Sequence, residues 1–536
     1  LVPAKTASGP TGRLLSEFAP LLPAEERLRD ACRVGQFAVF EDARPEAKTE
    51  ANHLRPAVLR VFCLGLDPAA PVHERGVWIR GAWIEGDGGD DLDLEGCGLP
   101  SPLALSNCRL TGRLVARDAT AKQLIFAGSH CAGIAADRLT CAGSIYLRDG
   151  FRAEGEVRFL GAIIGGDLEC TKGTFAASEG HALAFDGAKI GGTVFLKGTF
   201  RAEATVRFLG ATIGRDLDCM DGTFAASEGG ALAFDGAKIG GTVFLNGRFR
   251  AEATVRFRGA TIGGNLECAN GAFAASEGHA LAFDRAKIGG TVFLNGTFRA
   301  EATVRFPGAT IDGDLVCTDG TFAASEGDAL FFDRAKIGGN VSLDGRFRAE
   351  ATVRFLGATI GGNLECAGGC FEAELSLDLT KSKIAGTAFF IEGFHAAGRV
   401  GFLAATIDVL VDDETAWVGS TLFLDGLTIR RFAGDAPVDA AARIRWLERQ
   451  PADHLGRDFR PQPWEECARV LAEMGHERDA RILRVEKRRR MRWLDWNRVK
   501  TGKTRDAARR AWGVWIARRR AGRDARRCRR CRACPC

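Results

Sequence analysis

FRAEATVRFRGATIGGNLECANGAFAASEGHALAFDRAKIGGTVFLNGT, residues 249–297, is one copy of a 49-residue unit that repeats through the middle of the chain. Copies begin at Phe151, Phe200, Phe249, Phe298 and Phe347. Self-similarity at a fixed period is typical of proteins in which each unit buries its apolar face against its neighbours. The sequence therefore predicts an elongated repeat architecture, with function on an extended surface or at the ends.

Each unit contains two related halves. Val157–Phe175 aligns with Ala182–Phe200 without a gap when Val157 is placed one position before Leu183. Within each half, apolar residues alternate in short runs that are separated by Gly-rich corners, which predicts short strands with one buried face. Glycines at this density would interrupt a helix every two turns. We therefore expect each half to form one coil of roughly 24–25 residues in an all-β solenoid.

The corners and the length of the solenoid follow from the same pattern. The pairs Gly165-Gly166 and Gly191-Gly192 suit corners that need a positive φ or a close backbone approach. With more drift, the pattern extends from Gly76 to about Phe432. This gives on the order of fourteen coils and a rod of ~70 Å at ~4.8 Å per coil. We expect the right-handed coil that is usual in such solenoids.

Four regions are expected along the chain: a helical cap over residues 1–75, a β-solenoid over 76–432 with near-identical repeats at 151–370, a helical module over 433–500, and a basic low-complexity tail over 501–536, expected to be disordered. Caps are needed because terminal coils expose unpaired strand edges. In the first cap, Leu59, Phe62 and Cys63 form an apolar face that can cover the first coil.

The module at 433–500 is predicted to contain an αα-hairpin. Its first helix, 464–475, places Cys467, Leu471 and Met474 on one face and ends at Gly475. A second helix, beginning near His476, is expected to pack back through Ile482 and Val485.

Charge is distributed unevenly. Residues 478–532 contain 23 Lys and Arg against 5 Asp and Glu, although the whole chain carries only +5. One repeat, 151–199, has five basic and six acidic residues and is nearly neutral. DNA binding along the rod would need a basic stripe, so nucleic acid is not expected as a partner of the solenoid. The basic region 478–532, which includes several tryptophans, suits anionic lipid headgroups, and nucleic acid is the competing partner for this region.

The cysteines fall into two sets. A ladder at the repeat period is expected to be buried, with its members too far apart for disulfides: Cys170, Cys219, Cys268, Cys317 and Cys366. So many free thiols, with no signal peptide, favour a reducing cytoplasm. Cys528, Cys531, Cys534 and Cys536 have a spacing compatible with zinc or an iron–sulfur cluster. They are weak metal candidates, because RRCRRCRACPC contains no hydrophobic residues to build a site around them.

One arginine also recurs in every repeat. This ladder is interpreted either as a regular face for a partner or as a solvated row paired with nearby Asp or Glu: Arg158, Arg207, Arg256, Arg305 and Arg354. Asp186, Asp235, Asp284 and Asp333 recur too, but at 49-residue spacing they indicate a turn position rather than the clustered carboxylates of a glycosidase. No dinucleotide fingerprint is found, and the phosphate-loop match at 501–504 lacks its first glycine, so no cofactor is expected.

Several of these segments resemble a known family. GVWIRGAWIEG (76–86), the repeated GATIGGNLEC, and QPWEECARVLAEMGHERDARILRVEKRRR (462–490) are similar to bacterial, actinobacterial-type solenoid proteins labelled oxidoreductase or membrane-associated oxidoreductase. The resemblance covers roughly residues 76–490 and implies redox activity at a membrane. It supplies no catalytic motif that can be carried over residue by residue.

Two classes of function therefore compete. The first is a non-catalytic scaffold that presents its repeated surface to a protein partner or, peripherally, to the inner face of the membrane. The second is the oxidoreductase that the resemblance implies, with its chemistry in the divergent coils or in the helical ends. Five near-identical copies of one surface favour the scaffold, because they suit repeated binding and supply no unique catalytic constellation.

Overall fold

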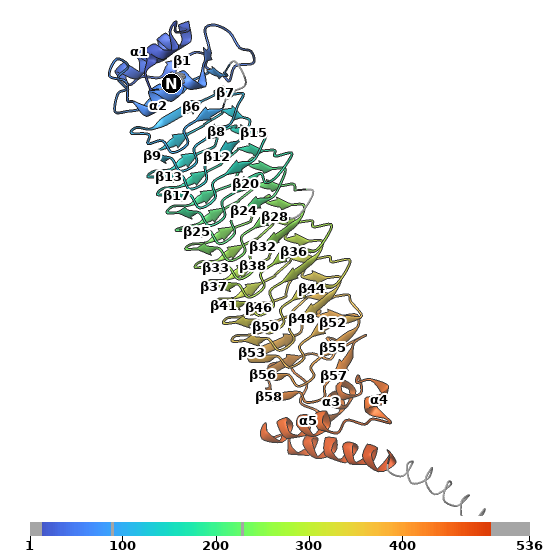
Figure 1. The fold of residues 1–536 in the computed structure, drawn as a ribbon. Helices are drawn as coiled ribbons and strands as arrows, with labels where there is room; N and C mark the ends of the chain where they lie inside the picture. The colour runs from blue at the N-terminus through green and yellow to red at the C-terminus, as the bar shows by residue number, and fades with distance from the viewer. Residues whose placement is uncertain (1–12, 87–90, 227–229, 495–536) are drawn as a thin grey trace, which may run out of the picture.

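The chain forms one long parallel β-solenoid with helices at both ends (Figure 1). The structure, a computed structural model, describes residues 13–86, 91–226 and 230–494. Its strands stack in parallel register over about 15 turns, one more than the fourteen predicted, because pairing already begins within residues 1–75 at β1 (Ala38–Val39) and β2 (His53–Leu54). The predicted all-β solenoid with helical ends is confirmed.

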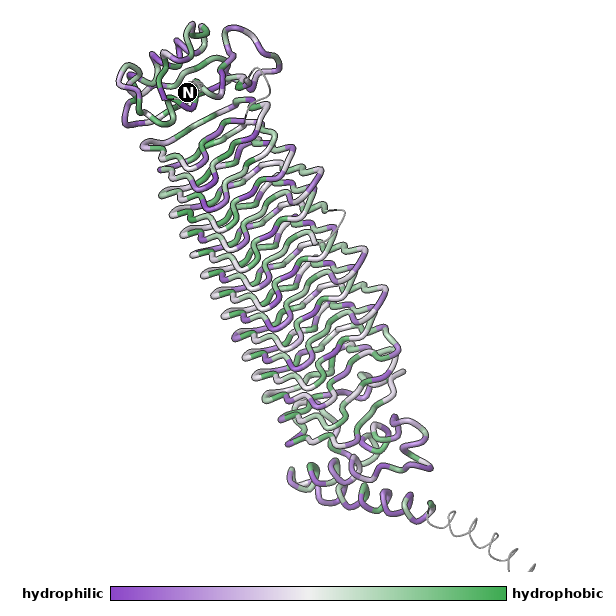
Figure 2. Tube along the Cα trace, in the orientation of Figure 1, coloured by the Kyte–Doolittle hydropathy of each residue, from purple (hydrophilic) through white to green (hydrophobic). Residues whose placement is uncertain are grey.

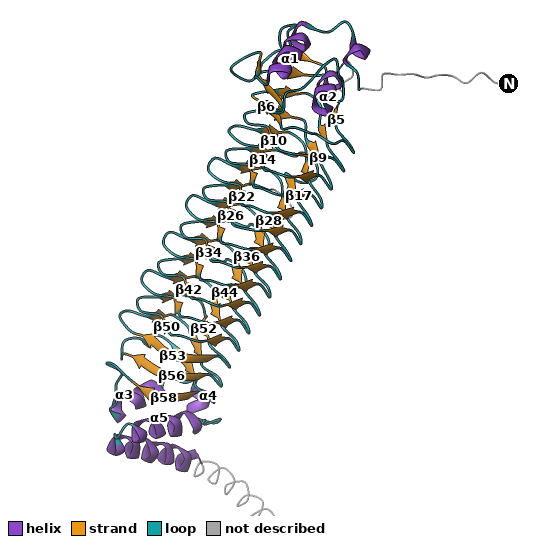
Figure 3. Ribbon diagram, turned by 90° about the vertical axis from the view of Figure 1, so that its left-hand side faces the viewer, coloured by secondary structure: helices purple, strands orange, loops and turns teal. Residues whose placement is uncertain are grey.

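Each turn of the repeat region contains four short strands joined by tight corners (Figure 3). One turn comprises β17 (Ile163–Ile164), β18 (Leu168–Glu169), β19 (Thr174–Phe175) and β20 (Leu183–Ala184). Each of these strands belongs to a stack that runs along the rod. We call the stacks of β17, β18, β19 and β20 columns 1, 2, 3 and 4, respectively. Columns 3 and 4 are 15-stranded sheets, whereas columns 1 and 2 are joined into one 28-stranded sheet. They join because β53 (Lys383–Phe390) is long enough to pair in both columns.

The strand register corrects the predicted alignment of the two halves. Val157 pairs with Leu183, not with Ala182, and Leu183 pairs with Val206. Successive turns are thus alternately 26 and 23 residues long rather than equal. The longer turn accommodates the AASEG loop, which the alignment did not place as an insertion.

The core is built from ladders of identical side chains, and hydropathy alternates regularly along the tube in Figure 2. One ladder of phenylalanines, which includes Phe234, Phe257 and Phe283, stacks with ring centroids 4.9 Å apart and nearly parallel planes. A second ladder, which includes Phe249 and Phe273, is tilted at about the same spacing. These spacings equal the distance between neighbouring strands, so each ring contacts its counterparts in the turns above and below.

The Gly-Gly corners are required by close backbone approach. A Cβ on Gly191 would lie 2.4 Å from the carbonyl oxygen of Gly165 in the turn below, and neither residue has a positive φ. Left-handed backbone occurs instead two residues before column 1, for example at Gly187 with φ 65°. Any side chain at Gly191 would push two turns apart.

The N-terminal cap comprises the 3-10 helix η1 (Leu15–Phe18), α1 (Pro23–Val34) and α2 (Pro56–Leu64). Glu25 of α1 is fully buried and receives two hydrogen bonds from the Arg55 guanidinium, at 2.6 and 2.8 Å. Leu59, Phe62 and Cys63 of α2 are buried, and α2 packs against β5 (Leu92–Asp93). An internal ion pair thus locks α1 onto the helix that covers the first coil.

The C-terminal cap comprises α3 (Ala440–Leu447), α4 (Ala452–Leu455), α5 (Gln462–Glu473) and a further helix over residues 477–494. Helix α5 covers the edge of the last strand, β58 (Thr428–Phe432). Glu466 accepts a hydrogen bond from the Ile429 amide at 2.9 Å, and Arg469 donates to the Ile429 carbonyl at 2.7 Å. These side chains satisfy the backbone groups that an open strand edge would leave unpaired.

The packing face predicted for the second helix of the hairpin is wrong. Ile482 and Val485 are 42% and 51% exposed, whereas Ala480 and Leu483 are fully buried. Lys487 also lies on the inner face, where it forms an ion pair with Glu465 of α5. Acidic residues of the neighbouring cap segments stabilise cations on this inner face. Hydrophobic periodicity alone does not detect such charge pairing.

Candidate interaction surfaces

The arginine ladder of column 4 is paired with aspartates throughout. Arg256 contacts Asp235 at 3.1 Å, and Arg354 contacts Asp333 at 2.8 Å. The same pairing recurs in the other repeats, in the pairs Arg158–Asp137, Arg207–Asp186 and Arg305–Asp284. Each Asp lies in the preceding turn, so the two ladders bridge neighbouring coils and neutralise one another. Their role as a face for a partner stays a prediction.

A second arginine row, on column 3, is paired in the same way. Arg201 and Arg250 each contact a glutamate two residues later at 3.0 Å, and Arg299 and Arg348 repeat this arrangement. These pairs are about half exposed, so each stabilises the fold by at most about 1 kcal/mol. Together with the Arg–Asp pairs of column 4, these pairs nevertheless leave the faces of columns 3 and 4 with balanced charge.

Column 1 differs, because its outward lysines are not paired. Lys and Thr alternate turn by turn along this row, as the strand register shows for Lys238, Thr261 and Lys287. The lysines are exposed and form no ion pair or side-chain hydrogen bond within the described part of the chain; they are Lys189, Lys238, Lys287, Lys336 and Lys383. We call these five the lysine row.

The spacing of the lysine row limits its self-repulsion. Lysines two strands apart are separated by about 9.6 Å, at which two charges repel by about 0.4 kcal/mol in water. Lysines in every turn would be half as far apart and would repel one another twice as strongly. Sequence reasoning missed this row, although AKIGG at the 49-residue period was the signal.

Further cations lie beside the second half of the lysine row. Arg285, Arg334 and Lys381 each stand two residues before a lysine of the row, with φ between 55° and 57°. Most other turns have glycine at this left-handed position, as at Gly236 and Gly259. A non-glycine residue there costs roughly 1 kcal/mol or more. The chain therefore places exposed positive charge here at a cost in backbone strain.

The lysine row ends in a hollow of about 630 Å³ beside α5. Thr359, Lys383 and Thr406 of column 1 line it together with Arg469 of α5. Arg469 is paired with Glu466 and Glu473, and a second lining arginine, Arg430, is paired with Asp408. Among the described lining residues, Lys383 is thus the cation without a carboxylate partner.

The helix at residues 477–494 has an outer face that is both basic and apolar. Ile482, Val485 and Trp493 are exposed, the last by 60%. They lie among exposed arginines, namely Arg478, Arg481, Arg488, Arg489 and Arg492. Of these five, only Arg489 forms an ion pair with another described residue, Glu486 at 3.7 Å.

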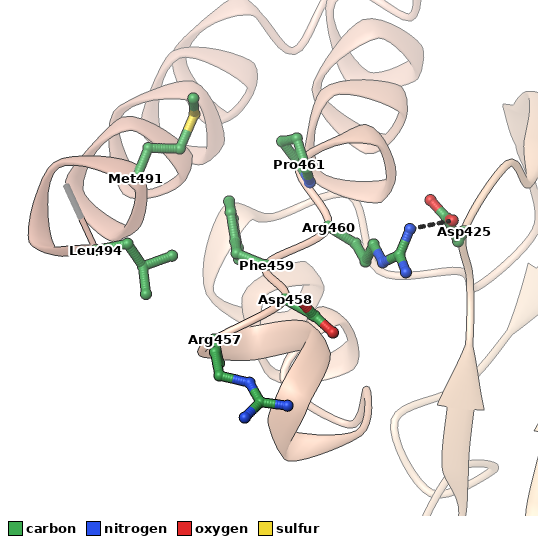
Figure 4. Close-up of a pocket in the computed structure, with 8 residues that line it drawn as sticks. All are labelled: Asp425, Arg457, Asp458, Phe459, Arg460, Pro461, Met491 and Leu494. Atoms are coloured by element: carbon green, nitrogen blue, oxygen red, sulfur yellow. Dashed lines mark hydrogen bonds and ion pairs between the residues drawn. The ribbon is translucent and has the colours of Figure 1, made fainter. Parts of the chain in front are cut away.

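A second hollow, of about 450 Å³, lies at the far end of this helix (Figure 4). Figure 4 shows Met491 and Leu494 of the helix on one side and Phe459 on the other. Arg460 closes one edge through an ion pair with Asp425 at 3.2 Å. The hollow is thus lined by apolar side chains of the helix and by apolar and charged residues of the segment before α5.

All five cysteines of the predicted ladder are fully buried. Burial holds the pKa of each thiol well above its usual value. The thiolates needed for redox or nucleophilic chemistry are therefore disfavoured at these positions. The candidate metal ligands Cys528, Cys531, Cys534 and Cys536 lie outside the described residues. No group of His, Cys, Asp and Glu arranged to hold a metal occurs in the described part of the chain.

The repeated surface is interrupted at one acidic cluster on column 4. Burial raises the pKa of Asp328 and of Asp333, and Asp378 adds repulsion to both. Arg354 lies between them, 2.8 Å from Asp333 and 3.8 Å from Asp328. Carboxyl groups with raised pKa values occur at many catalytic sites, but both of these are held in an ion-pair network.

Comparison with known proteins found no match for this chain among protein-family models, curated proteins or solved structures. None of the described helices is both long and apolar enough to cross a membrane.

Proposed function

We propose that this protein is a non-catalytic β-solenoid scaffold that docks peripherally on an anionic membrane surface through the outer face of helix 477–494. The observation that carries the proposal is the placement of Ile482, Val485 and Trp493 on the solvent side of the helix, where four of the five neighbouring arginines have no carboxylate partner among the described residues. A helix that lies in a lipid interface combines apolar side chains with Lys and Arg in this way.

The repeated surface supports the scaffold part of the proposal. Charges on columns 3 and 4 are paired within the rod, and the same side chains recur every two turns. Such a surface presents one binding chemistry many times at fixed spacing. The helix at one end would hold this surface at the membrane, with a protein partner along the rod.

Vesicle binding tests the membrane part. Full-length protein is sedimented with vesicles of phosphatidylcholine containing about a third phosphatidylserine, and with phosphatidylcholine alone. Arg481, Arg488 and Arg492 changed together to Gln should weaken binding to the anionic vesicles by at least 10-fold, because each cation near the surface contributes about 1 kcal/mol. The double variant Ile482→Ser with Val485→Ser should also weaken it, because it removes apolar insertion.

The matched control removes the same charge elsewhere. Arg201, Arg250 and Arg299 changed together to Gln lie on column 3, far from the helix. Equal loss of binding in the two triple variants would refute docking through the helix and assign it to net charge.

The oxidoreductase that the resemblance implies stays a competing prediction. An absorbance spectrum with metal analysis of the native full-length protein tests it, because a stoichiometric flavin, haem or iron–sulfur signal would establish a redox group and overturn the non-catalytic assignment.

A further inference from the structure

We propose that the lysine row is a track for an extended acidic segment of a partner protein, held in polyproline II conformation with a carboxylate at every third residue. The inference rests on the proposed scaffold function and names the chemistry of the partner. It uses a different surface from the membrane-docking helix.

The chemistry of the row calls for a linear anionic ligand. The five lysines lie in one straight line, because consecutive strands of column 1 pair in parallel register without a shift from Lys189 to Lys383. Threonines lie between them, and their hydroxyls, which form no hydrogen bond with another described residue, can donate to a carboxylate or a carbonyl group. Arg285, Arg334 and Lys381 raise the number of cations in the second half of the track from one to two for every two turns.

The spacing selects the conformation of the ligand. Lysines recur every ~9.6 Å, and a polyproline II helix repeats every three residues at 3.1 Å each, or about 9.3 Å. Over the ~38 Å between the first and last lysine, this mismatch accumulates to roughly 1 Å, which flexible lysine side chains absorb. A β-strand presents like-facing residues every ~6.7 Å. An α-helix presents them about every 10.5 Å, so it drifts by roughly 4 Å over the same length.

Two other ligands fit less well. The backbone groups of column 1 are already bonded to the turns above and below, so a partner strand cannot add by β-augmentation on this face. Duplex DNA lying on a flat face brings the phosphates of one strand to that face about once per ~34 Å helical turn. It would thus contact only one or two of the five lysines. An acidic segment is also extended before binding, because its charges repel one another.

The hollow beside α5 would hold one end of the segment. Lys383 lies in it without a carboxylate partner among the described residues, next to Thr359 and Thr406. Asp312, an exposed residue two positions after Thr310, lies near the middle of the track and forms no ion pair within the described chain. Its carboxylate opposes an anionic ligand, so Asp312→Asn should tighten binding.

Fluorescence anisotropy with synthetic peptides on the full-length protein tests the proposal. The probe is a labelled Glu-Pro-Pro repeat of about 15 residues, roughly 46 Å long in polyproline II. A peptide of the same composition, with all its glutamates in one block, is the register control. The repeat peptide should bind at least several-fold more tightly than the block peptide, and its affinity should fall as salt is raised.

Variants localise the site. Lys238, Lys287 and Lys336 changed together to Gln should weaken binding of the repeat peptide on the order of 10-fold. The column 3 triple variant at Arg201, Arg250 and Arg299 should bind as the wild type does. Lys383→Gln should weaken binding more than Lys189→Gln, because Lys383 lies in the hollow. Circular dichroism and thermal melting verify that each variant is folded.

Three outcomes would overturn the assignment. Equal binding of the two peptides removes the spacing argument. Equal weakening in the two triple variants shows attraction to net charge only. Tighter binding of polygalacturonate than of the peptide, with the same lysine dependence, assigns the track to an acidic polysaccharide. Failure here is separable from failure of membrane docking, because the lysine variants should still bind anionic vesicles and the helix variants should still bind the peptide.

Discussion

A buried ion pair holds the C-terminal cap on the solenoid, and removing one partner should release the cap. Arg443 of α3 and Asp412, the last residue of β56 (Thr406–Asp412), are each 1% exposed and are joined by two hydrogen bonds of 2.9 and 3.0 Å. The same guanidinium donates to the Pro437 carbonyl at 2.7 Å and lies 3.8 Å from the centre of the Phe432 ring. Arg443 thus contacts two strands of the last coils at once.

Arg443→Met keeps most of the side-chain volume but removes the charge. The Asp412 carboxylate would then be buried with the Trp417 indole, at 2.9 Å, as its described side-chain donor. Breaking a buried pair in this way costs about 3–5 kcal/mol, so the equilibrium for opening the cap should shift by a factor of about 10² to 10³ or more. Changing Asp412 to Leu in the same chain removes the stranded charge and should recover about 2 kcal/mol of that loss.

Amide hydrogen exchange measures the effect locally. A rod of stacked turns does not unfold in one two-state step, so a single melting temperature would mix the cap with the body. Exchange should accelerate in α3, α5 and β58 of the Arg443→Met protein, and amides in the middle turns should stay protected. Unchanged protection in the single variant, or a double variant no more protected than the single one, would refute the argument that a stranded charge drives the opening.

Other predictions concern the body of the rod. Iodoacetamide labelling with peptide mapping should modify Cys97 and Cys370, which are partly exposed, well before the five buried ladder thiols, and rapid native labelling of Cys268 would contradict the core register. Burial raises the pKa of Cys141 from 9.0 to about 11 and that of Cys131 to about 12. The contribution of these thiols to folding stability should therefore be fully present well below pH 9 and be lost as the pH rises from 9 toward 11, which urea unfolding at several alkaline pH values measures. Phe257→Ala should cost about 3–5 kcal/mol, because it leaves a cavity between two stacked rings. Phe293→Ala, which removes a half-buried ring from the outside of column 2, should cost less than half as much, and exchange in the flanking turns tests both.

The fold was predictable because every local signal repeats. Val157 and Phe159 alternate with Glu156 and Arg158 at strand spacing, and both apolar residues are buried. The register between the halves was not predictable in the same way, because the shared GTF ending favours one alignment and the shared GA-x-IGG favours another. The structure follows the second, since the glycine corners must stack on one another for the backbones to approach, whereas the ends of the loops are free to differ in length.

The basic charge of residues 478–532 was visible in the sequence, but the lysine row and the outward orientation of Ile482 and Val485 were not. Both were missed because charge pairing decides which side chains face solvent and which face the protein. The repeat contains arginines and lysines at similar spacing, yet Arg207 and its equivalents are satisfied by aspartates one turn away and Lys238 and its equivalents are not. In helix 477–494, pairing of Lys487 with Glu465 and of Arg490 with Glu448 lets cations occupy the inner face. Ile482 and Val485 therefore face outward, against the hydrophobic pattern. Whether a charged residue is available to another molecule can be judged only when the residue paired with it in the fold is known. In each of these cases that residue lies 21 or more positions away in the sequence.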